Sequence, residues 1–153
     1  MELDRFDRAI LEALQQDGRI SNVDLAHRVS LSESACLRRV RALEASGIIE
    51  RYVALLNQKQ AGLGGDVFVN IALHAEVQSE LAAFEEAVQA IPEVMECYLM
   101  TGEFDYLLRV VVADMADFER IHKESLTQLP GVARVNSSVA IRTVRKTTQL
   151  PVN

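Results

Sequence analysis

The sequence predicts an α+β protein in which a helical N-terminal domain precedes a domain of two βαβ units. Three observations predict this class. Apolar residues keep helical spacing over the first 46 residues, a polar and then glycine-rich stretch follows at 58–65, and a strand-and-helix pattern occurs twice after it. With 49% hydrophobic and 25% charged residues, the 153-residue chain has a globular composition and can form one domain or two small ones.

The first half of the chain is predicted to form short helices. Apolar spacing gives the first helix, which ends at the turn signal at 17–18. Ser21 precedes Asp24 by three residues, a capping pattern that opens a second helix over about 22–29. A four-residue break at 30–33 then separates the second helix from a third.

The third helix is expected to end at Ser46, because Gly47 suits the left-handed position that terminates a helix. Ser32 or Ser34 can cap its beginning. Residues 48–56 are rich in β-branched and aromatic side chains and are short enough for a strand or hairpin. Two helices joined by a tight turn, with such a segment after them, predict a winged helix-turn-helix.

The second half contains an internal repeat. We place the domain boundary in the 58–65 stretch and expect domains at 1–61 and 62–153. Pro92 and Pro130 lie 38 residues apart, and each ends a helix and starts a strand. Strands are expected over 66–74, 94–100, 104–112 and 132 to about 144, with helices after the first and third. This βαββαβ order is ferredoxin-like. Its helices cover one sheet face, and we expect self-association to cover the other.

Charge is distributed unevenly along the chain. The formal net charge is -6, yet residues 1–61 hold nine Lys/Arg and nine Asp/Glu, whereas residues 62–153 hold seven and thirteen. Within residues 27–51, five arginines face three glutamates. Contact with phosphate groups needs a basic stripe on the docking surface and not on the whole chain, so the first half can bind nucleic acid.

The predicted third helix carries a surface suited to the major groove. At about 100° per residue, Ser34, Arg38 and Arg41 lie opposite its apolar stripe. Small side chains permit close approach, and arginine can bridge guanine edges or phosphates. Arg39 lies on the flank and suits a phosphate or a structural pair with a carboxylate. These charges could also be an ordinary solvated helix face, but the capped preceding helix and the turn favour DNA. The candidate DNA contacts are Ser32, Ser34, Arg38, Arg39, Arg41 and Arg51.

Residues 101–106 are predicted to form a hairpin turn from which Asp105 enters an otherwise apolar strand. A carboxylate in that position needs a partner, and an α-ammonium group would serve. Exposed N–H groups at Gly102 could bind an α-carboxylate. Asp105 could equally pair with Arg134 or Arg109 of the protein, so at this point both interpretations stay open.

Other classes of protein find little support. Cys36 and Cys97 form no CxxC pair, and the three histidines lie 47 and 48 residues apart, which argues against a disulfide framework, a metal site and a resident cofactor bound there. Nothing indicates an enzyme, because paired carboxylates, a nucleophile with its base and a phosphate-binding glycine loop are all missing. No apolar run reaches the roughly eighteen residues of a membrane span and no signal peptide is evident, so we expect a cytoplasmic protein with no membrane partner.

The sequence resembles the leucine-responsive regulatory protein/AsnC family, the feast-or-famine regulators, over nearly its whole length. In the first half the resemblance rests on LDRFDRAIL at 3–11, DGRIS at 17–21 and, most specifically, LSESACLRRVRALEASGII at 31–49. In the second half it rests on TGEFDY at 101–106, LPGV at 129–132 and TTQLP at 147–151. Glu33 stands where the family often has proline.

The resemblance implies a winged-helix DNA-binding domain and a domain called RAM, for regulation of amino-acid metabolism. RAM domains pair through their sheets into dimers, which commonly build octamers. Effector amino acids in this family lie between RAM domains of neighbouring dimers, near a Gly-x-x-Asp turn that Gly102 and Asp105 match. Candidate effector contacts are Gly102 and Asp105, their weaker neighbours Thr101 and Tyr98, and the last-strand hydroxyls Ser137 and Ser138, which could reach the same rim or be plain strand residues.

These observations predict a regulator that binds double-stranded DNA as a dimer, or an assembly of dimers up to an octamer, and responds to a small amino acid. A dimer would place two recognition helices in successive major grooves of a roughly palindromic site. The alternative is a nucleoid-architectural protein without an effector, for which weak specificity and a steep salt dependence would be typical.

Overall fold

The computed structural model describes residues 2–152 and divides the chain into two compact units. The helical unit comprises the residues up to Leu55 together with those from Arg145 onward, and the sheet unit comprises Leu56–Val144. This division differs from the expected domains, 1–61 and 62–153, because segment 56–61 lies with the sheet and the C-terminal segment returns to the helices.

Three helices build the helical unit: α1 (Arg5–Gln16), α2 (Asn22–Arg28) and α3 (Glu33–Ala45). They enclose one apolar core, whose most buried members are Ile10, Ala13, Leu25, Ala26, Cys36 and Leu43. The helix-turn-helix predicted from the sequence is therefore present as α2, a short turn and α3.

Each of these three helices begins at a side-chain cap. Ser21 and Ser32 accept hydrogen bonds from the backbone N–H groups three residues later, as predicted. At the start of α1, the Asp4 carboxylate accepts from the N–H of Phe6 at 2.8 Å and of Asp7 at 2.9 Å. The Asp7 carboxylate accepts from the N–H of Asp4 in return, at 3.2 Å, which completes a capping box.

The β segment expected after α3 is not formed. Residues 48–57 contain no strand among the described residues, and Val53, Leu55 and Leu56 are more than half exposed. A strand needs a neighbour whose N–H and C=O groups it can pair with, and this segment has none. Within the segment, the Tyr52 hydroxyl donates to the Glu44 carboxylate at 3.0 Å, and Ile49 packs against the core of the helical unit.

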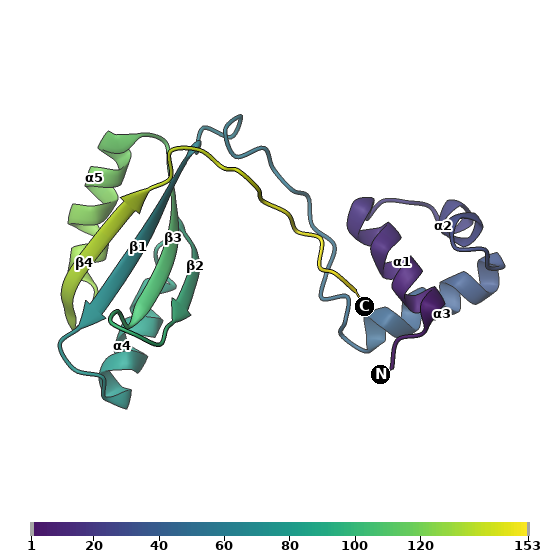
Figure 1. Ribbon diagram of the computed structural model, residues 1–153, viewed down its shortest axis with the longest axis horizontal. Coiled ribbons are helices and arrows are strands. Elements are labelled where there is room, and N and C mark those ends of the chain that lie inside the picture. The colour runs from purple at the N-terminus through teal and green to yellow at the C-terminus, as the bar shows by residue number, and fades with distance from the viewer. Residues whose placement is uncertain (1, 153) are drawn as a thin grey trace. The chain divides into compact units, whose positions relative to one another are not determined.

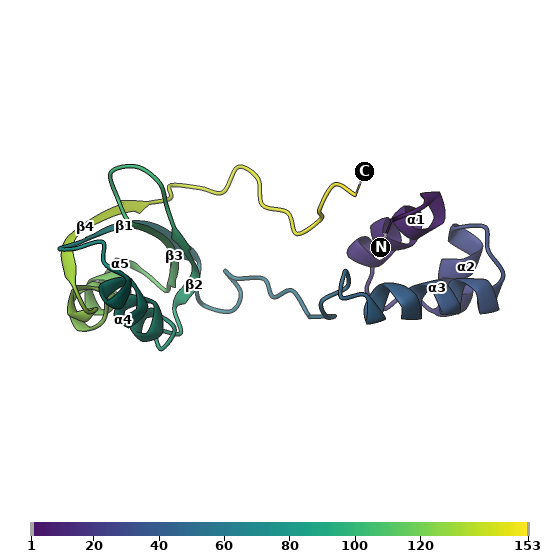
Figure 2. The same cartoon turned by 90° about the horizontal axis from the view of Figure 1, so that it is seen from below.

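The sheet unit has four strands and two helices. In chain order these are β1 (Gly65–Leu73), α4 (Gln78–Val88), β2 (Val94–Leu99), β3 (Tyr106–Val112), α5 (Met115–Glu124), a 3₁₀ turn (Leu126–Gln128) and β4 (Val132–Val139). The strand order is β2-β3-β1-β4, and every neighbouring pair is antiparallel. Both helices cover the same face of the sheet (Figures 1 and 2). The predicted ferredoxin-like class is confirmed, although the last strand ends at Val139 and not near 144.

Alternation along the strands separates the two faces of this sheet. Val67, Val69 and Ile71 of β1 are fully buried against the helices. Phe84 of α4 stacks on Tyr106 of β3, with ring centroids 4.3 Å apart, and closes the core. In the part of the chain that the structure describes, no helix is long and apolar enough to cross a membrane.

Candidate functional site

The exposed face of α3 presents the arginines that the sequence singled out. Arg38 and Arg41 are exposed, whereas Cys36 and Leu43 on the opposite side are fully buried. Within residues 2–152, the guanidinium groups of Arg38 and Arg41 have no ion pair. Two unpaired cations three residues apart lie on one helix face and can bind an anion together.

The start of α3 adds hydroxyl groups to this surface. Ser32 and Ser34 are both exposed, and their Oγ atoms lie 3.4 Å apart. The turn before them is held by Asn22, whose side-chain amide donates to the carbonyl oxygen of Glu33 at 2.9 Å. Arg51 is exposed in the extended segment after α3, and no ion pair within the described chain involves it.

Arg39 has a different environment from its neighbours. Its Nη1 atom lies 2.8 Å from Oδ2 of Asp4 and 2.8 Å from Oδ1 of Asp7. The backbone N–H of Asp7, followed by the Arg39 guanidinium, lowers the pKa of the Asp4 carboxyl. Of the two roles that the sequence left open for Arg39, the structure places it in the pair with carboxylates, so this side chain joins α3 to the first turn of α1.

The turn between β2 and β3 has the geometry of a closed hairpin end. The N–H of Met100 donates to the carbonyl of Asp105 at 2.8 Å, and the N–H of Asp105 donates to the carbonyl of Ile71 at 2.9 Å. Thr101 and Gly102 are exposed, and Gly102 has φ +105, a conformation that L side chains rarely adopt. The turn therefore presents its backbone to the surface.

Asp105 is buried, with 7% of its surface exposed, and its Oδ2 atom accepts from the backbone N–H of Leu73 at 2.7 Å. Neither suggested arginine is its partner: Arg134 pairs with Glu103 at 3.0 Å, and Arg109 lies on the uncovered sheet face. Sequence patterns could not identify this partner, because a backbone N–H leaves no residue-type signal.

Glu76, in the loop between β1 and α4, was not predicted as part of this site. Its carboxyl group is hydrogen-bonded to that of Asp105, and this bond raises the pKa of Glu76. Two carboxyl groups this close to each other are harder to ionise together than either would be alone. The only sequence signal was an acid three residues beyond the end of a strand, which is too common to single out.

The remaining effector candidates do not all meet at this turn. Tyr98 lies opposite Leu107 on β3, close to the turn along β2. Ser137 and Ser138 lie opposite Val69 and Phe68 on β4, which is the far edge of the sheet from β2. Within one chain, the strand order therefore keeps these hydroxyls away from the turn, contrary to the suggestion that they reach the same rim.

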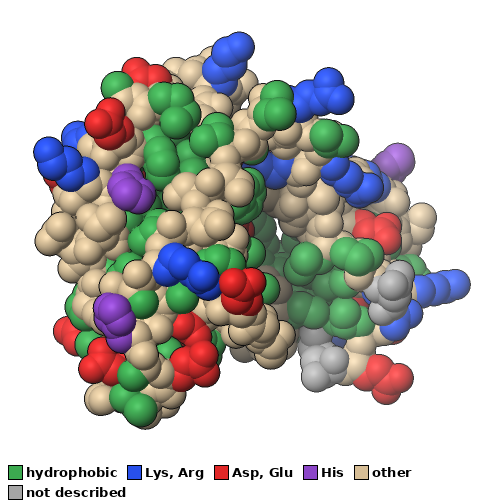
Figure 3. All heavy atoms as spheres, turned by 60° about the vertical axis from the view of Figure 1, so that its left-hand side comes forward, with side chains coloured by type: hydrophobic (Ala, Val, Ile, Leu, Met, Phe, Trp, Pro, Cys, Tyr) green, Lys and Arg blue, Asp and Glu red, His purple; other side chains and the backbone are tan. Residues whose placement is uncertain are grey.

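The sheet face without helices carries apolar and charged side chains together. Phe68 is 39% exposed and Tyr98 52% exposed. Arg109 lies opposite Phe68 on one side and Glu96 on the other, and it donates to Asp66 at 2.6 Å and to Glu96 at 3.1 Å. We call the sheet face without helices, formed by Phe68, Tyr98, Leu107 and the Arg109 ion pairs, the open face. Figure 3 shows one side of the molecule, on which hydrophobic side chains lie among charged ones.

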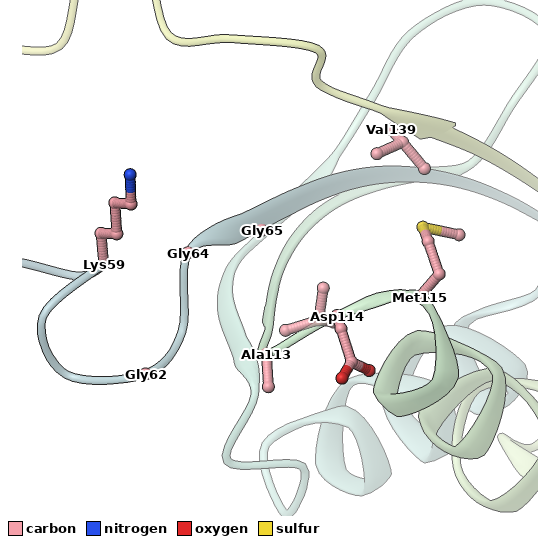
Figure 4. Close-up of a pocket in the computed structure, with 9 residues that line it drawn as sticks. Lys59, Gly62, Gly64, Gly65, Ala113, Asp114, Met115 and Val139 are labelled. Carbon is pink, nitrogen blue, oxygen red and sulfur yellow. The ribbon is translucent and has the colours of Figure 1, made fainter.

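A hollow of about 580 Å³ opens at the end of the sheet, between the 62–65 glycine segment and the start of α5 (Figure 4). Gly65 is required at its edge, because a Cβ atom there would lie 2.7 Å from Cγ2 of Val112. Lys59, Asp114 and Met115 also line the hollow, and no candidate effector residue does.

Among residues 2–152, no three His, Cys, Asp or Glu side chains gather in a way that could hold a metal ion. Cys36 is buried in the helical unit and Cys97 is half-buried on β2. Burial raises the pKa of both thiols, that of Cys97 to about 11.

Comparison with known proteins assigns both units. Residues 3–50 match the model of a winged helix-turn-helix DNA-binding domain, and residues 66–150 match that of the Lrp/AsnC ligand binding domain. The leucine-responsive regulatory protein of Escherichia coli (strain K12) is 44% identical over 149 residues, which cover 97% of this chain and 91% of that protein.

Solved structures agree with this assignment. A transcriptional regulator from Neisseria meningitidis, in complex with L-Met, superposes with a TM-score of 0.94 at 38% identity over 99% of this chain and 98% of the other. The feast or famine regulatory protein from M. tuberculosis, complexed with L-methionine, gives a TM-score of 0.86 at 32% identity over 97% and 99%. These findings confirm the family and the function class expected from the sequence. This chain belongs to the Lrp/AsnC family of transcription regulators and combines a DNA-binding winged helix-turn-helix with a ligand-binding domain.

Proposed function

We propose that this regulator reads double-stranded DNA with the exposed face of α3, as a dimer or an assembly of dimers, and that a small amino acid bound at the β2–β3 turn sets its DNA affinity. The observation that carries the proposal is the contrast along α3. Arg38 and Arg41 have no ion pair with any residue of 2–152 and lie on one exposed face, while Arg39 is held by two carboxylates. The first two are available to an anionic partner and the third positions them.

On DNA, α3 enters the major groove with its N-terminal end toward the bases. The short side chains of Ser32 and Ser34 allow close approach and can donate hydrogen bonds. Arg38 and Arg41 bind guanine edges or flanking phosphates, since a guanidinium fork suits both. Arg51 contacts the phosphate backbone from the segment that follows.

The effector site is proposed at the turn of residues 101–105. Two relatives were solved with methionine, which supports an amino acid as the ligand. A zwitterion needs a carboxylate for its ammonium group and N–H donors for its carboxylate. Asp105 offers the first, through its carboxylate and the neighbouring Glu76, and the backbone at Thr101 and Gly102 offers the second.

Tyr98 borders this site from β2, the strand that leads into the turn. Ser137 and Ser138 lie on β4, at the opposite edge of the sheet. The two serines can complete a site only from another copy of the chain. We therefore place the effector where chains adjoin, so that its binding changes the assembly and with it the spacing of recognition helices.

Self-association is proposed through the open face. An aromatic patch rimmed by charges is a surface that monomers seldom leave in water, and a two-fold axis would bring two such patches together. Dimers of this kind could assemble further, up to octamers. We also propose that the regulator works in the cytoplasm.

The test is a binding titration on DNA from the promoter of the protein's own gene, at fixed salt, with and without each of the twenty amino acids. A shift in affinity with one or a few amino acids supports both halves of the proposal. DNA binding without any amino-acid response would contradict the effector role and favour the architectural alternative. Absence of specific DNA binding would contradict the proposal for α3. Arg120→Ala on α5 is a matched control, because it removes one arginine from a surface with acidic partners.

A further inference from the structure

The C-terminal segment 147–152 returns to the helical unit and ends near α1 (Figures 1 and 2). The Gln15 side chain of α1 holds it there. The side-chain amide of Gln15 donates from Nε2 to the carbonyl oxygen of Leu150 at 3.1 Å, and the N–H of Leu150 donates to Gln15 Oε1 at 2.6 Å. Gln15 thus pairs with the main chain of the segment as a neighbouring β-strand would.

Apolar contact reinforces this pairing. Val152 is half-buried and packs against the apolar core of the helical unit, as Ile49 does. The Leu150 side chain is 74% exposed, so its main chain and not its side chain is recognised. A local hydrogen bond restricts the segment before the contact, because the Thr147 hydroxyl accepts from the N–H of Gln149 at 3.1 Å. Pro151 restricts the backbone after the contact residue and lowers the entropy lost on docking.

The Gln15–Leu150 contact lies at the opposite end of α1 from the ion pairs that join this helix to α3. Gln15 lies in the last turn of α1, while Asp4 and Asp7 at the beginning of the same helix hold Arg39 of α3. Helix α1 is therefore fixed at one end to the recognition helix and at the other end to segment 147–152. Releasing the second attachment removes a contact from the last turn of α1, which is then held by core packing that includes Ile10 and Ala13.

We infer that residues 147–152 are a working part of the DNA-binding unit: seated on α1 by Gln15 and Val152, they hold the recognition helix in its DNA-binding arrangement. The same segment continues the chain beyond β4, so the ligand-binding domain is joined to the DNA-binding unit by two stretches of chain, before β1 and after β4. A change at the effector site can then act on α3 through the second stretch. This part of the inference rests on the function proposed above.

The docking itself is tested by hydrogen exchange of the Leu150 amide in the full chain, without DNA. Gln15→Ala removes both hydrogen bonds at Leu150. Gln149→Ala is the matched control, since it makes the same chemical change in an exposed tail residue whose side chain has no hydrogen bond among the described residues. We expect exchange at Leu150 to become roughly tenfold faster in Gln15→Ala and to stay unchanged in Gln149→Ala. Equal exchange in wild type and Gln15→Ala would overturn the docking.

The functional consequence is tested by DNA titration of the same two variants and of a chain ending at Lys146. We expect about threefold weaker binding for Gln15→Ala, a larger loss for the shortened chain, and wild-type binding for Gln149→Ala. Wild-type affinity in Gln15→Ala and in the shortened chain would overturn the inference while leaving the proposed function intact. Failure of the wild-type protein to bind DNA would instead contradict the proposed function. Circular dichroism of each variant shows whether the helices are retained.

Discussion

Nη1 of Arg39 lies 2.8 Å from Oδ1 of Asp7, so the helix that carries the proposed DNA-binding arginines is ion-paired to the first turn of α1. Arg38, one residue earlier, has no partner in the described chain. Of these two adjacent arginines, Arg39 stabilises the fold, and we propose that Arg38 binds DNA. The first two predictions separate these roles.

Arg39→Met keeps most of the side-chain volume and removes the charge. We expect it to lower the melting temperature by a few degrees, because Asp4 and Asp7 lose their shared cation. DNA affinity measured well below that temperature should fall less than in Arg38→Ala. Thermal denaturation followed by circular dichroism checks the first result. A variant with unchanged melting and strongly reduced DNA binding would make Arg39 a DNA contact.

Arg38→Ala and Arg41→Ala should each weaken DNA binding without changing the melting temperature, since neither side chain forms an ion pair in the part of the chain that the structure describes. A titration at several salt concentrations distinguishes what each arginine touches. Loss of a phosphate contact reduces the slope of log K against log salt by about 0.9, whereas loss of a base contact leaves the slope and relaxes sequence preference. Unchanged affinity in both variants would remove α3 from the interface.

Asp105 has a structural and a proposed ligand-binding role, which two substitutions separate. Asp105→Asn keeps an oxygen that can accept from the N–H of Leu73 and removes the negative charge. We expect a folded protein with normal DNA binding and no amino-acid response. Asp105→Ala leaves the buried N–H unpaired and should cost about 1–3 kcal/mol in free energy of unfolding as well. Calorimetric titration with the effector measures the first effect and urea unfolding the second. A normal response in Asp105→Asn would place the site elsewhere.

The cap of α1 predicts a pH dependence. The N–H of Asp7, and then Arg39, lower the pKa of Asp4 below its ordinary value. A carboxyl whose pKa is lowered on folding stabilises the folded chain above its unfolded pKa, near 3.8, and this contribution disappears as pH falls through the lowered value. The melting temperature of Asp4→Ala should therefore lie below that of wild type at pH 7 and approach it below pH ~3.5. Glu12→Ala, exposed on the same helix, is the control. A difference that stays constant with pH would exclude the charged cap as its cause.

The open face predicts the oligomeric state. Phe68→Lys would place a cation opposite Arg109 in the middle of the proposed dimer interface. We expect dimer dissociation at concentrations at which wild type stays paired, with the dimer dissociation constant raised by at least about tenfold. Ala83→Lys, exposed on α4, makes a comparable change on a helix that covers the other face. Sedimentation velocity distinguishes the species. Identical profiles for wild type and Phe68→Lys would move the interface to another surface.

Local patterns were sufficient to predict most of the fold. The caps at Ser21 and Ser32 could be predicted because each joins a hydroxyl to an N–H only three residues away. Pro92 and Pro130 could likewise be assigned to helix ends, because proline restricts only its immediate neighbours. The strand predicted over 48–56 is absent, since its residue types favour a strand only when a partner is present.

The site could be predicted less completely than the fold. Exposure of Arg38 and Arg41 follows from helical period alone. The partner of Arg39, the N–H that Asp105 binds and the docking of Leu150 on Gln15 each join positions at least 32 residues apart. Such contacts depend on tertiary structure, and two of the three use main-chain atoms, which no residue pattern records. The positions of Ser137 and Ser138 relative to the turn could not be predicted either, because they depend on the order of strands in the sheet.

The two cysteines lie in different units, and this gives each unit its own built-in reporter. Only a thiolate attacks a disulfide reagent, and burial raises the pKa of both the Cys36 and the Cys97 thiol, so both react more slowly in the folded chain. The rate at which Cys36 is labelled therefore reports how often the DNA-binding unit opens, and the rate at which Cys97 is labelled reports how often the sheet unit opens. A ligand that slows one reaction and not the other identifies the unit to which it binds, with no engineered probe.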